Sequence, residues 1–271
     1  MKTRLDVCMV NRALTASREK ARARILAGEV EVNGVTVTKP GTMIDDSAEI
    51  VLHGEGDLFV GRGGLKLEKL LAEHKPSLAG LTCLDVGAST GGFTDAMLSR
   101  GASKVYAVDV GTGQLAESLR RDPRVVSMEK TDIRTVTREM LGGCVDFAGI
   151  DVSFISLTKI LGPVAALLAP GAEVGCLIKP QFEAGREHVG KHGIVKSADV
   201  HTEVLTRVAA CAGAVGLAVR ELTWSPVRGG SGNIEYLMFA AYTPEEALPE
   251  TSFREQAERT VNEAFRYYCQ P

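Results

Sequence analysis

The sequence predicts an α/β protein: a doubly wound, mostly parallel sheet with an antiparallel last strand, preceded by a small α+β domain. Short apolar runs alternate with helical patterns from residue 81 to residue 224, which is typical of parallel β-α units. Two apolar runs, 217–224 and 234–242, then follow one another across a glycine-rich loop, so the last strand should be antiparallel. The first 50 residues instead contain short helices and a hairpin signal.

Length and charge indicate two unequal domains. The chain has 271 residues, 45% hydrophobic and 24% charged, with a net charge of −3. We expect domains at 1–57 and 63–271, joined by a linker at 58–62. Residues 1–40 carry eight Lys or Arg against four Asp or Glu, a basic segment that suits an anionic partner. No pattern predicts an oligomeric state.

Other classes are disfavoured by what the sequence lacks. It has no signal-peptide pattern and no apolar run near the ~18 residues that a membrane span needs, so we expect a cytoplasmic protein without a membrane partner. The six cysteines are scattered without a C-x-x-C pair, which favours reduced thiols over disulfides or zinc.

The small domain is predicted from one helix and one hairpin. Apolar spacing predicts a helix over 18–27, which Gly28 ends. Val30–Val32 and Val35–Val37 flank Asn33-Gly34, a strong hairpin signal because both turn residues tolerate positive φ. The basic side chains of the helix point outward, and spacing alone fits a phosphate clamp and a solvated charged face equally well.

The large domain is organised around a glycine-rich loop, Leu84-Asp-Val-Gly-Ala-Ser-Thr-Gly-Gly-Phe-Thr94. A strand that runs through glycines into a helix places backbone N–H groups around a small ligand. The dinucleotide fingerprint needs a glycine at its middle position, where this chain has Ser89. The loop therefore favours a nucleoside ligand without phosphates, such as S-adenosylmethionine, over a nicotinamide dinucleotide. A ligand-free strand–helix turn explains the glycines about as well.

Charged residues follow several predicted strands. Asp85, Asp109, Asp132, Asp151 and Lys179 all lie at or just after an apolar run. Since ligands of such sheets bind beyond the carboxyl ends of the strands, we expect these side chains to converge. Asp109 lies 24 residues after Asp85, close to the spacing that places a carboxylate on ribose hydroxyls. A helix cap is an alternative for Asp109, and for Asp132 it fits the spacing equally well.

Two parts of the chain resemble known families. The run from Arg4-Leu-Asp through Ser17-Arg-Glu-Lys-Ala-Arg to Val30-Glu-Val-Asn-Gly resembles an S4 RNA-binding domain. The rest resembles the FtsJ-type 2′-O-ribose methyltransferases, through the motifs Arg-Gly-Gly-Leu-Lys66-Leu, Asp151-Val-Ser-Phe, Leu-Ile-Lys179-Pro-Gln-Phe-Glu and Gly-Asn-Ile-Glu235-Tyr. Over nearly its whole length the chain is similar to the TlyA family, whose members are often named hemolysins.

The resemblance implies a Rossmann-like methyltransferase domain and an enzyme. Its expected reaction is methyl transfer from S-adenosylmethionine to a cytidine ribose of 16S or 23S ribosomal RNA, with no metal required. The implied catalytic tetrad is Lys66, Asp151, Lys179 and Glu235. Cofactor contacts are expected from Asp85, Gly87, Ser89, Gly91, Asp109 and Asp132, with Phe154 and Leu115 as further candidates beside the adenine. RNA contacts are expected from Arg4, Arg18, Lys20, Arg22 and Arg24.

Alternatives remain for the chain and for one residue. The large domain could be a catalytically silent partner of an RNA-binding module; binding of S-adenosylmethionine, which an intact set of Asp85, Gly87 and Asp109 predicts, would discriminate between the two. A membrane-active hemolysin is disfavoured by the missing export signal and spanning segment. Lys179 could stabilise the developing 2′-alkoxide, or accept its proton if the lysine were neutral, because an ordinary lysine is protonated at neutral pH and a poor base.

Overall fold

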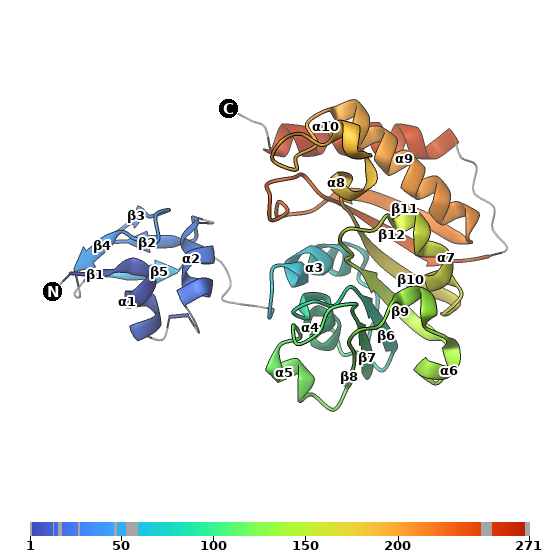
Figure 1. Cartoon of the computed structure of the whole chain (residues 1–271), viewed down its shortest axis with the longest axis horizontal. Coiled ribbons are helices and arrows are strands. Elements are labelled where there is room, and N and C mark those ends of the chain that lie inside the picture. Colours follow the sequence, from blue (N-terminus) through green and yellow to red (C-terminus); the bar gives the residue numbers. More distant parts are fainter. Residues whose placement is uncertain are drawn as a thin grey trace. The chain divides into compact units, whose positions relative to one another are not determined.

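The computed structural model describes residues 2–12, 14–15, 18–26, 28–45, 48–52, 59–244 and 251–268. The chain divides into two compact units, Met1–Leu58 and Phe59–Pro271, and Figure 1 labels their elements. Of the expected linker 58–62, Leu58 lies outside the described residues, and the other four belong to the second unit. Phe59 is buried in that unit's core, where it packs on Gly64 so closely that a Cβ there would overlap its ring.

The first unit combines two helices and five short strands in its described part. These are β1 (Lys2–Arg4), α1 (Leu5–Asn11), α2 (Arg18–Leu26), β2 (Val30–Val32), β3 (Val35–Thr36), β4 (Met43–Asp45) and β5 (Ile50–Leu52). The predicted hairpin is confirmed: β2 pairs with β3, and Asn33 and Gly34 have φ of 51° and 78°. The predicted helix ends at Leu26, and Ala27 lies outside the described residues. β1 and β4, which pair with each other, were not predicted because three-residue strands show no periodicity.

The second unit is built on a seven-stranded sheet. Its strands are β6 (Thr82–Val86), β7 (Lys104–Val108), β8 (Val125–Met128), β9 (Val145–Ile150), β10 (Leu168–Ile178), β11 (Leu217–Trp224) and β12 (Tyr236–Tyr242). They are ordered β11-β12-β10-β9-β6-β7-β8. The five strands from β10 to β8 are mutually parallel, and β12 is antiparallel to both of its neighbours. The predicted doubly wound sheet with an antiparallel last strand is confirmed.

Helices cover both faces of this sheet. The larger ones are α3 (Gly63–His74), α4 (Gly92–Ser99), α9 (Ala198–Ala214) and α10 (Thr251–Tyr268), and the shorter ones are α5 (Glu117–Arg120), η1 (Ile133–Thr135), α6 (Arg138–Leu141), η2 (Leu157–Lys159), α7 (Leu161–Ala165), α8 (Pro180–Glu183) and η3 (Arg186–His188). In Figure 1, α3 and α4 lie on one face of the sheet, and α9 and α10 lie on the other. Neighbouring strand residues serve opposite cores: Cys176 packs with α9 and Leu177 with α3, as the two-residue period requires.

A buried carboxylate stabilises the first unit. Asp6 is 0% exposed and accepts hydrogen bonds from Arg4 (3.0 Å to each oxygen) and Arg18 (3.1 Å). The Arg4 hydrogen bond, the largest cause, lowers the pKa of Asp6 to about 2. A carboxyl whose pKa falls on folding adds stability above its unfolded pKa of about 3.9, and this stability is lost as the pH falls towards the folded value.

We therefore expect α1 and α2 to lose hydrogen-exchange protection between about pH 4 and pH 2. Replacement of Asp6 with Asn should lower that protection by about tenfold at pH 7, less than the full shift implies because both arginines are half exposed to solvent. Exchange read by mass spectrometry on the full chain measures this. An Asp6→Asn variant that still lost protection as steeply as the wild type below pH 4 would contradict the assignment.

Candidate active site

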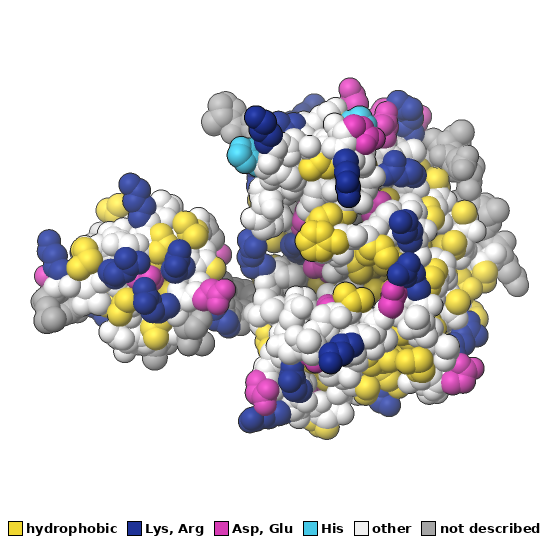
Figure 2. Space-filling view, in the orientation of Figure 1, with side chains coloured by type: hydrophobic (Ala, Val, Ile, Leu, Met, Phe, Trp, Pro, Cys, Tyr) yellow, Lys and Arg dark blue, Asp and Glu magenta, His cyan; other side chains and the backbone are white. Residues whose placement is uncertain are grey.

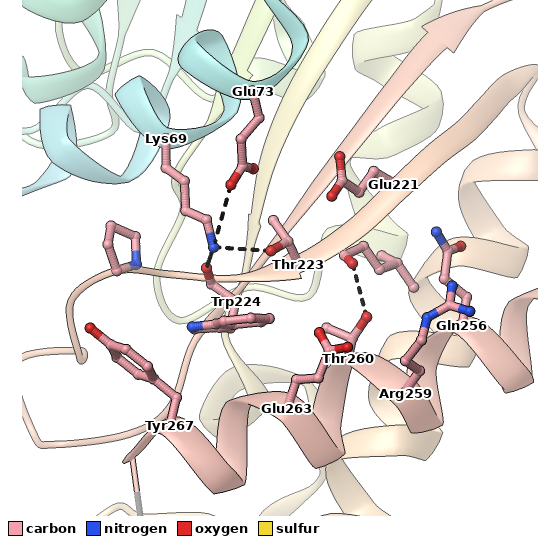
Figure 3. Close-up of a pocket in the computed structure, with 12 residues that line it drawn as sticks. Lys69, Glu73, Glu221, Thr223, Trp224, Gln256, Arg259, Thr260, Glu263 and Tyr267 are labelled. Atoms are coloured by element: carbon pink, nitrogen blue, oxygen red, sulfur yellow. Dashed lines mark hydrogen bonds and ion pairs between the residues drawn. The ribbon is translucent and has the colours of Figure 1, made fainter.

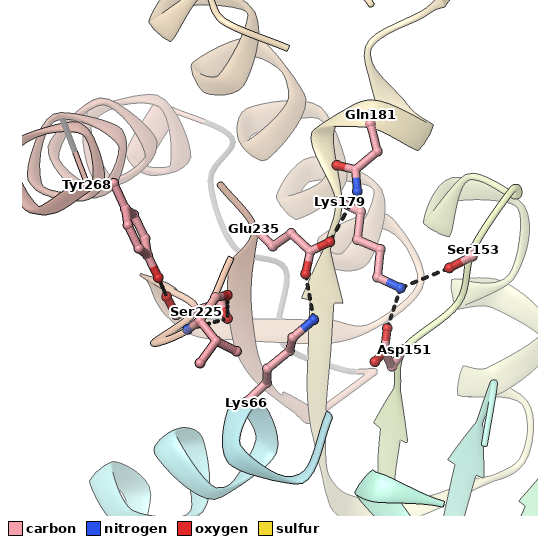
Figure 4. A network of polar contacts seen from close by, with 9 residues as sticks. Lys66, Asp151, Ser153, Lys179, Gln181, Ser225, Glu235 and Tyr268 are labelled. Atoms are coloured by element: carbon pink, nitrogen blue, oxygen red, sulfur yellow. Dashed lines mark hydrogen bonds and ion pairs between the residues drawn. The ribbon is translucent and has the colours of Figure 1, made fainter. Parts of the chain in front are cut away.

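One edge of the sheet collects the four residues of the predicted tetrad. Lys66 lies in the first turn of α3, Asp151 directly follows β9, Lys179 directly follows β10, and Glu235 directly precedes β12. Because β12 runs antiparallel to β10, its start lies beside the end of β10, where Tyr236 pairs with Ile178. Figure 4 shows the four side chains converging from these elements.

The four side chains form two ion pairs. Lys66 Nζ lies 2.6 Å from Glu235 Oε2, and Lys179 Nζ lies 2.5 Å from Asp151 Oδ1. Glu235 is only 2% exposed, and Lys66 is also buried. Burying paired charges is expensive unless they are fully hydrogen-bonded, so this arrangement indicates a purpose other than stability alone.

Two further side chains complete these pairs and were missed in the sequence. Gln181 Nε2 donates to Glu235 Oε1 at 3.1 Å, and Lys179 Nζ donates to Ser153 Oγ at 3.0 Å. Both lie two residues after a tetrad member, Gln181 after Lys179 and Ser153 after Asp151. Both residues belong to the motifs that contain Lys179 and Asp151, and this membership was the sequence signal that could have identified them.

A cavity of about 570 Å³ adjoins the tetrad at the carboxyl ends of β6, β7 and β9. Its volume falls within the roughly 300–1,000 Å³ of small-molecule sites. Its wall includes four of the six predicted cofactor residues, Gly87, Ser89, Asp109 and Asp132, and it reaches Asp151. Phe154 also lines it, 91% exposed and at a positive φ of 64°.

The glycine-rich loop is tied to the next strand through Asp109. The Ser89 N–H donates to Asp109 Oδ2 at 2.8 Å, and the Gly111 N–H donates to Oδ1 at 2.6 Å. A carboxylate has about four acceptor positions, so Asp109 can hold this loop and still accept from a ligand hydroxyl. At Gly87 the φ is 86°, and a Cβ would overlap the carbonyl oxygen of Asp151, so only glycine fits there.

Two predicted cofactor residues and one adenine candidate lie behind the cavity and not in its wall. Asp85 is wholly buried, and its Oδ2 accepts from the N–H (2.8 Å) and Oγ1 (2.6 Å) of Thr94, which ties β6 to the start of α4. Burial raises the pKa of Asp85 to about 7. Gly91 is a glycine because a Cβ would overlap Leu119, and Leu115 is buried against the same point. These residues pack behind the glycine-rich loop and determine its shape.

Asp132 has the position of a helix cap as well as a place in the cavity wall. Its Oδ1 accepts from the Arg134 N–H at 3.0 Å at the start of η1, and its Oδ2 lies 2.6 Å from Arg134 Nη2. The side-chain hydrogen bond from Arg134 lowers the pKa of Asp132 to about 2. The cap alternative is therefore what the carboxylate does in this structure.

Family models match both units. The FtsJ-like methyltransferase model matches residues 59–242, and the S4 domain model matches residues 3–50. A Bacillus subtilis relative named as a candidate rRNA methyltransferase, YqxC, is 47% identical over 98% of this chain and 95% of its own length. A Mycobacterium tuberculosis relative, the 16S/23S rRNA (cytidine-2′-O)-methyltransferase TlyA, is 38% identical over 97% of this chain and 98% of its own. The chain belongs to the TlyA family of FtsJ-like methyltransferases.

The TlyA-family fold also appears among solved structures. A Streptococcus thermophilus protein described as a candidate hemolysin matches with a TM-score of 0.75 and 45% identity, over 98% of each chain.

In the described part of the present chain, no helix is long and apolar enough to cross a membrane. The same residues contain no group of three or more His, Cys, Asp or Glu side chains placed to hold a metal ion.

The basic side chains that were predicted to contact RNA differ in their exposure to solvent and in their partners within the S4 unit. Figure 2 shows several Lys and Arg side chains on the visible face of this unit. Arg22 is exposed, Arg4 and Arg18 are exposed but bonded to Asp6, and Lys20 is half-buried. Arg24 is buried and pairs with Glu29 at 3.0 Å, so it supports α2 and is not placed to contact RNA. Its outward position in the helical pattern was misleading because Glu29, five residues further along the chain, pairs with its guanidinium.

A second cavity, of about 560 Å³, lies beside the helix that carries Lys66 (Figure 3). Lys69, one turn further along α3, donates to Thr223 Oγ1 at 3.0 Å and to the Trp224 carbonyl at 2.7 Å. Its Nζ also lies 4.3 Å from the centre of the Trp224 ring. Since its donors are used within the protein, we interpret Lys69 as an anchor that holds α3 against β11.

Proposed function

We propose that this TlyA-family protein transfers a methyl group from S-adenosylmethionine to the 2′-oxygen of a cytidine in ribosomal RNA. The observation that carries the proposal is the convergence of Lys66, Asp151, Lys179 and Glu235 beside a nucleoside-sized cavity. The relative from M. tuberculosis, whose name specifies 16S and 23S rRNA and cytidine, supplies the substrate class. An rRNA substrate implies work in the cytoplasm and no membrane partner.

The cavity fits the cofactor. Asp109 has acceptor capacity for the ribose hydroxyls, and Gly87 and Ser89 present backbone close to the space in which the methionine portion would lie. Ile133 and Ile155 add apolar surface for the adenine, and Phe154 stays a candidate for the same contact. Asp85 and Gly91 would act by shaping the loop.

Bound S-adenosylmethionine supplies a methyl group activated by a sulfonium. As the new O–C bond forms and the C–S bond of the donor breaks, the 2′-hydroxyl must lose its proton. Lys179 Nζ, which lies between Asp151 and Ser153, would stabilise the oxygen as an ammonium group, or receive the proton if it were the neutral amine. Most of the acceleration would come from holding this oxygen in line with the methyl group. We propose a metal-free reaction because the departing thioether is neutral and needs no Lewis acid.

Methyl transfer to isolated subunits tests the proposal. Purified protein, S-adenosylmethionine with a labelled methyl group and unmodified 16S- or 23S-containing subunits should yield a 2′-O-methylcytidine, mapped by mass spectrometry of nuclease fragments. Binding of both cofactor and rRNA without transfer to either subunit would instead identify a catalytically silent RNA-binding protein.

Asp109→Ala should weaken cofactor binding by at least about tenfold. The change removes an acceptor for the ribose and leaves the Ser89 and Gly111 N–H groups without their carboxylate, and hydrogen bonds to charged groups are worth about 1.5–3 kcal/mol each. Calorimetry measures the dissociation constant. Asp122→Ala, which removes a carboxylate paired with Arg124 outside the cavity, is the control. Equal affinities for the two variants would refute the role of Asp109.

Arg22→Ala should weaken rRNA binding and leave cofactor affinity unchanged. We propose that the exposed arginines of the S4 unit contact phosphates, and each lost contact should lower the slope of log K against log salt by about 1. Filter binding between about 50 and 200 mM salt measures this. Arg254→Ala, an exposed arginine on α10 paired with Glu258, is the matched control. If both variants keep the wild-type slope, Arg22 does not contact RNA.

A further inference from the structure

The loop that leads to Glu235 is held from outside by the end of α10. At its start, the Ser225 N–H donates to the Glu235 carbonyl at 2.9 Å, which closes the loop where β11 and β12 separate. The carbonyl of the same Ser225 accepts from the Tyr268 hydroxyl at 2.6 Å. Ser225 is fully buried, and Figure 4 shows the Tyr268 side chain approaching it from the side opposite Glu235.

A second contact ties the middle of the loop to the same residue. Arg228 Nη2 donates to the Tyr268 carbonyl at 2.7 Å, and its guanidinium lies 4.8 Å from the centre of the Tyr268 ring. The hydroxyl, the ring and the carbonyl of Tyr268 therefore all contact residues of the same loop. Each contact lies within 10 residues of Glu235 in the sequence.

The loop needs such support, and its position matters to the tetrad. It contains three glycines between 229 and 232, which gives its backbone more conformational freedom than other residues would. Gly229 packs directly on the Glu235 carboxylate, so closely that a Cβ would overlap Oε1. A displaced loop would therefore release or push the carboxylate that holds Lys66 Nζ at 2.6 Å.

We propose that Tyr268, at the end of the last helix, is a positioning residue for Glu235. It holds the 225–233 loop closed, so that Glu235 keeps Lys66 in place beside the reacting centre. The consequence for turnover rests on the proposed function, whereas the consequence for the Lys66–Glu235 pair does not.

Tyr268→Phe, which removes only the hydroxyl, tests the proposal, with Tyr267→Phe as the matched control. Tyr267 is the neighbouring residue, 60% exposed, and its ring packs against Trp224 and Tyr268. For Tyr268→Phe we expect kcat to fall about tenfold, the value of roughly one hydrogen bond, with KM for rRNA and cofactor affinity within twofold of wild type. Tyr267→Phe should match the wild type throughout.

A second readout is independent of methylation. In the full chain, an amine-reactive acylating reagent should modify Lys66 several-fold faster in Tyr268→Phe than in Tyr267→Phe, with the rate of modification measured by mass spectrometry. Equal kcat and equal Lys66 labelling in the two variants would overturn the proposal. So would a parallel loss of kcat, cofactor affinity and thermal stability, which indicates general loosening. An inactive wild type would refute the proposed function, and Lys66 labelling would still decide the positioning role.

Discussion

Lys179→Ala is expected to reduce methyl transfer by at least about 100-fold while cofactor affinity stays near that of the wild type. Whether Lys179 stabilises the oxygen or takes its proton, alanine offers neither function, and such groups contribute about 10²–10⁴-fold. The cofactor cavity is built from other residues, although it reaches Asp151. Single-turnover methylation and calorimetry measure the two quantities separately.

Lys104→Ala is the control for this variant, because Lys104 is an exposed lysine at the start of β7, at the opposite end of that strand from the cavity. It should keep both full turnover and full affinity. Turnover by Lys179→Ala at the wild-type rate would reject the tetrad assignment altogether.

Glu235→Ala is expected to cost both activity and stability, the second by about 3–5 kcal/mol, because it leaves the buried Lys66 ammonium without its carboxylate. Replacing both charges, Lys66→Met with Glu235→Leu, should recover most of that stability, since a buried ion pair can often be exchanged for apolar side chains. The double variant should remain inactive. Urea denaturation and the methylation assay measure the two effects.

This comparison separates a chemical role from a structural one. A double variant that recovered stability and methylated rRNA would show that the Lys66–Glu235 pair serves the fold only. A double variant no more stable than Glu235→Ala would show that the site requires a charge pair for folding.

The repeated β-α units were predictable because burial on both faces of a parallel sheet requires continuous apolar runs, and these are visible in the sequence. β11 and the Asn33-Gly34 hairpin matched their predicted bounds closely. β1 and β4 were not predicted, because three residues are too few to show the two-residue period of a strand. The tetrad was located through motifs, and its convergence depends on β12 entering the sheet antiparallel beside β10.

The site predictions that changed all concern burial. Arg24 looked like an exposed cation, and Asp85 and Gly91 looked like ligand contacts, because a sequence pattern gives the type and spacing of side chains but not what covers them. The structure places Glu29 over Arg24, Thr94 over Asp85 and Leu119 over Gly91. Each of these neighbours is five or more residues away along the chain.

The sequence by itself determined the two-domain α/β organisation and the glycine-rich loop, since these depend on local periodicity and residue chemistry, and its motifs identified the four charged residues through their resemblance to the FtsJ type. The tertiary structure alone decided how those charges pair, which loop residues reach the cavity, and that the last helix holds the segment before Glu235. Such pairings join residues as far apart as Lys66 and Glu235, and only packing brings these into contact.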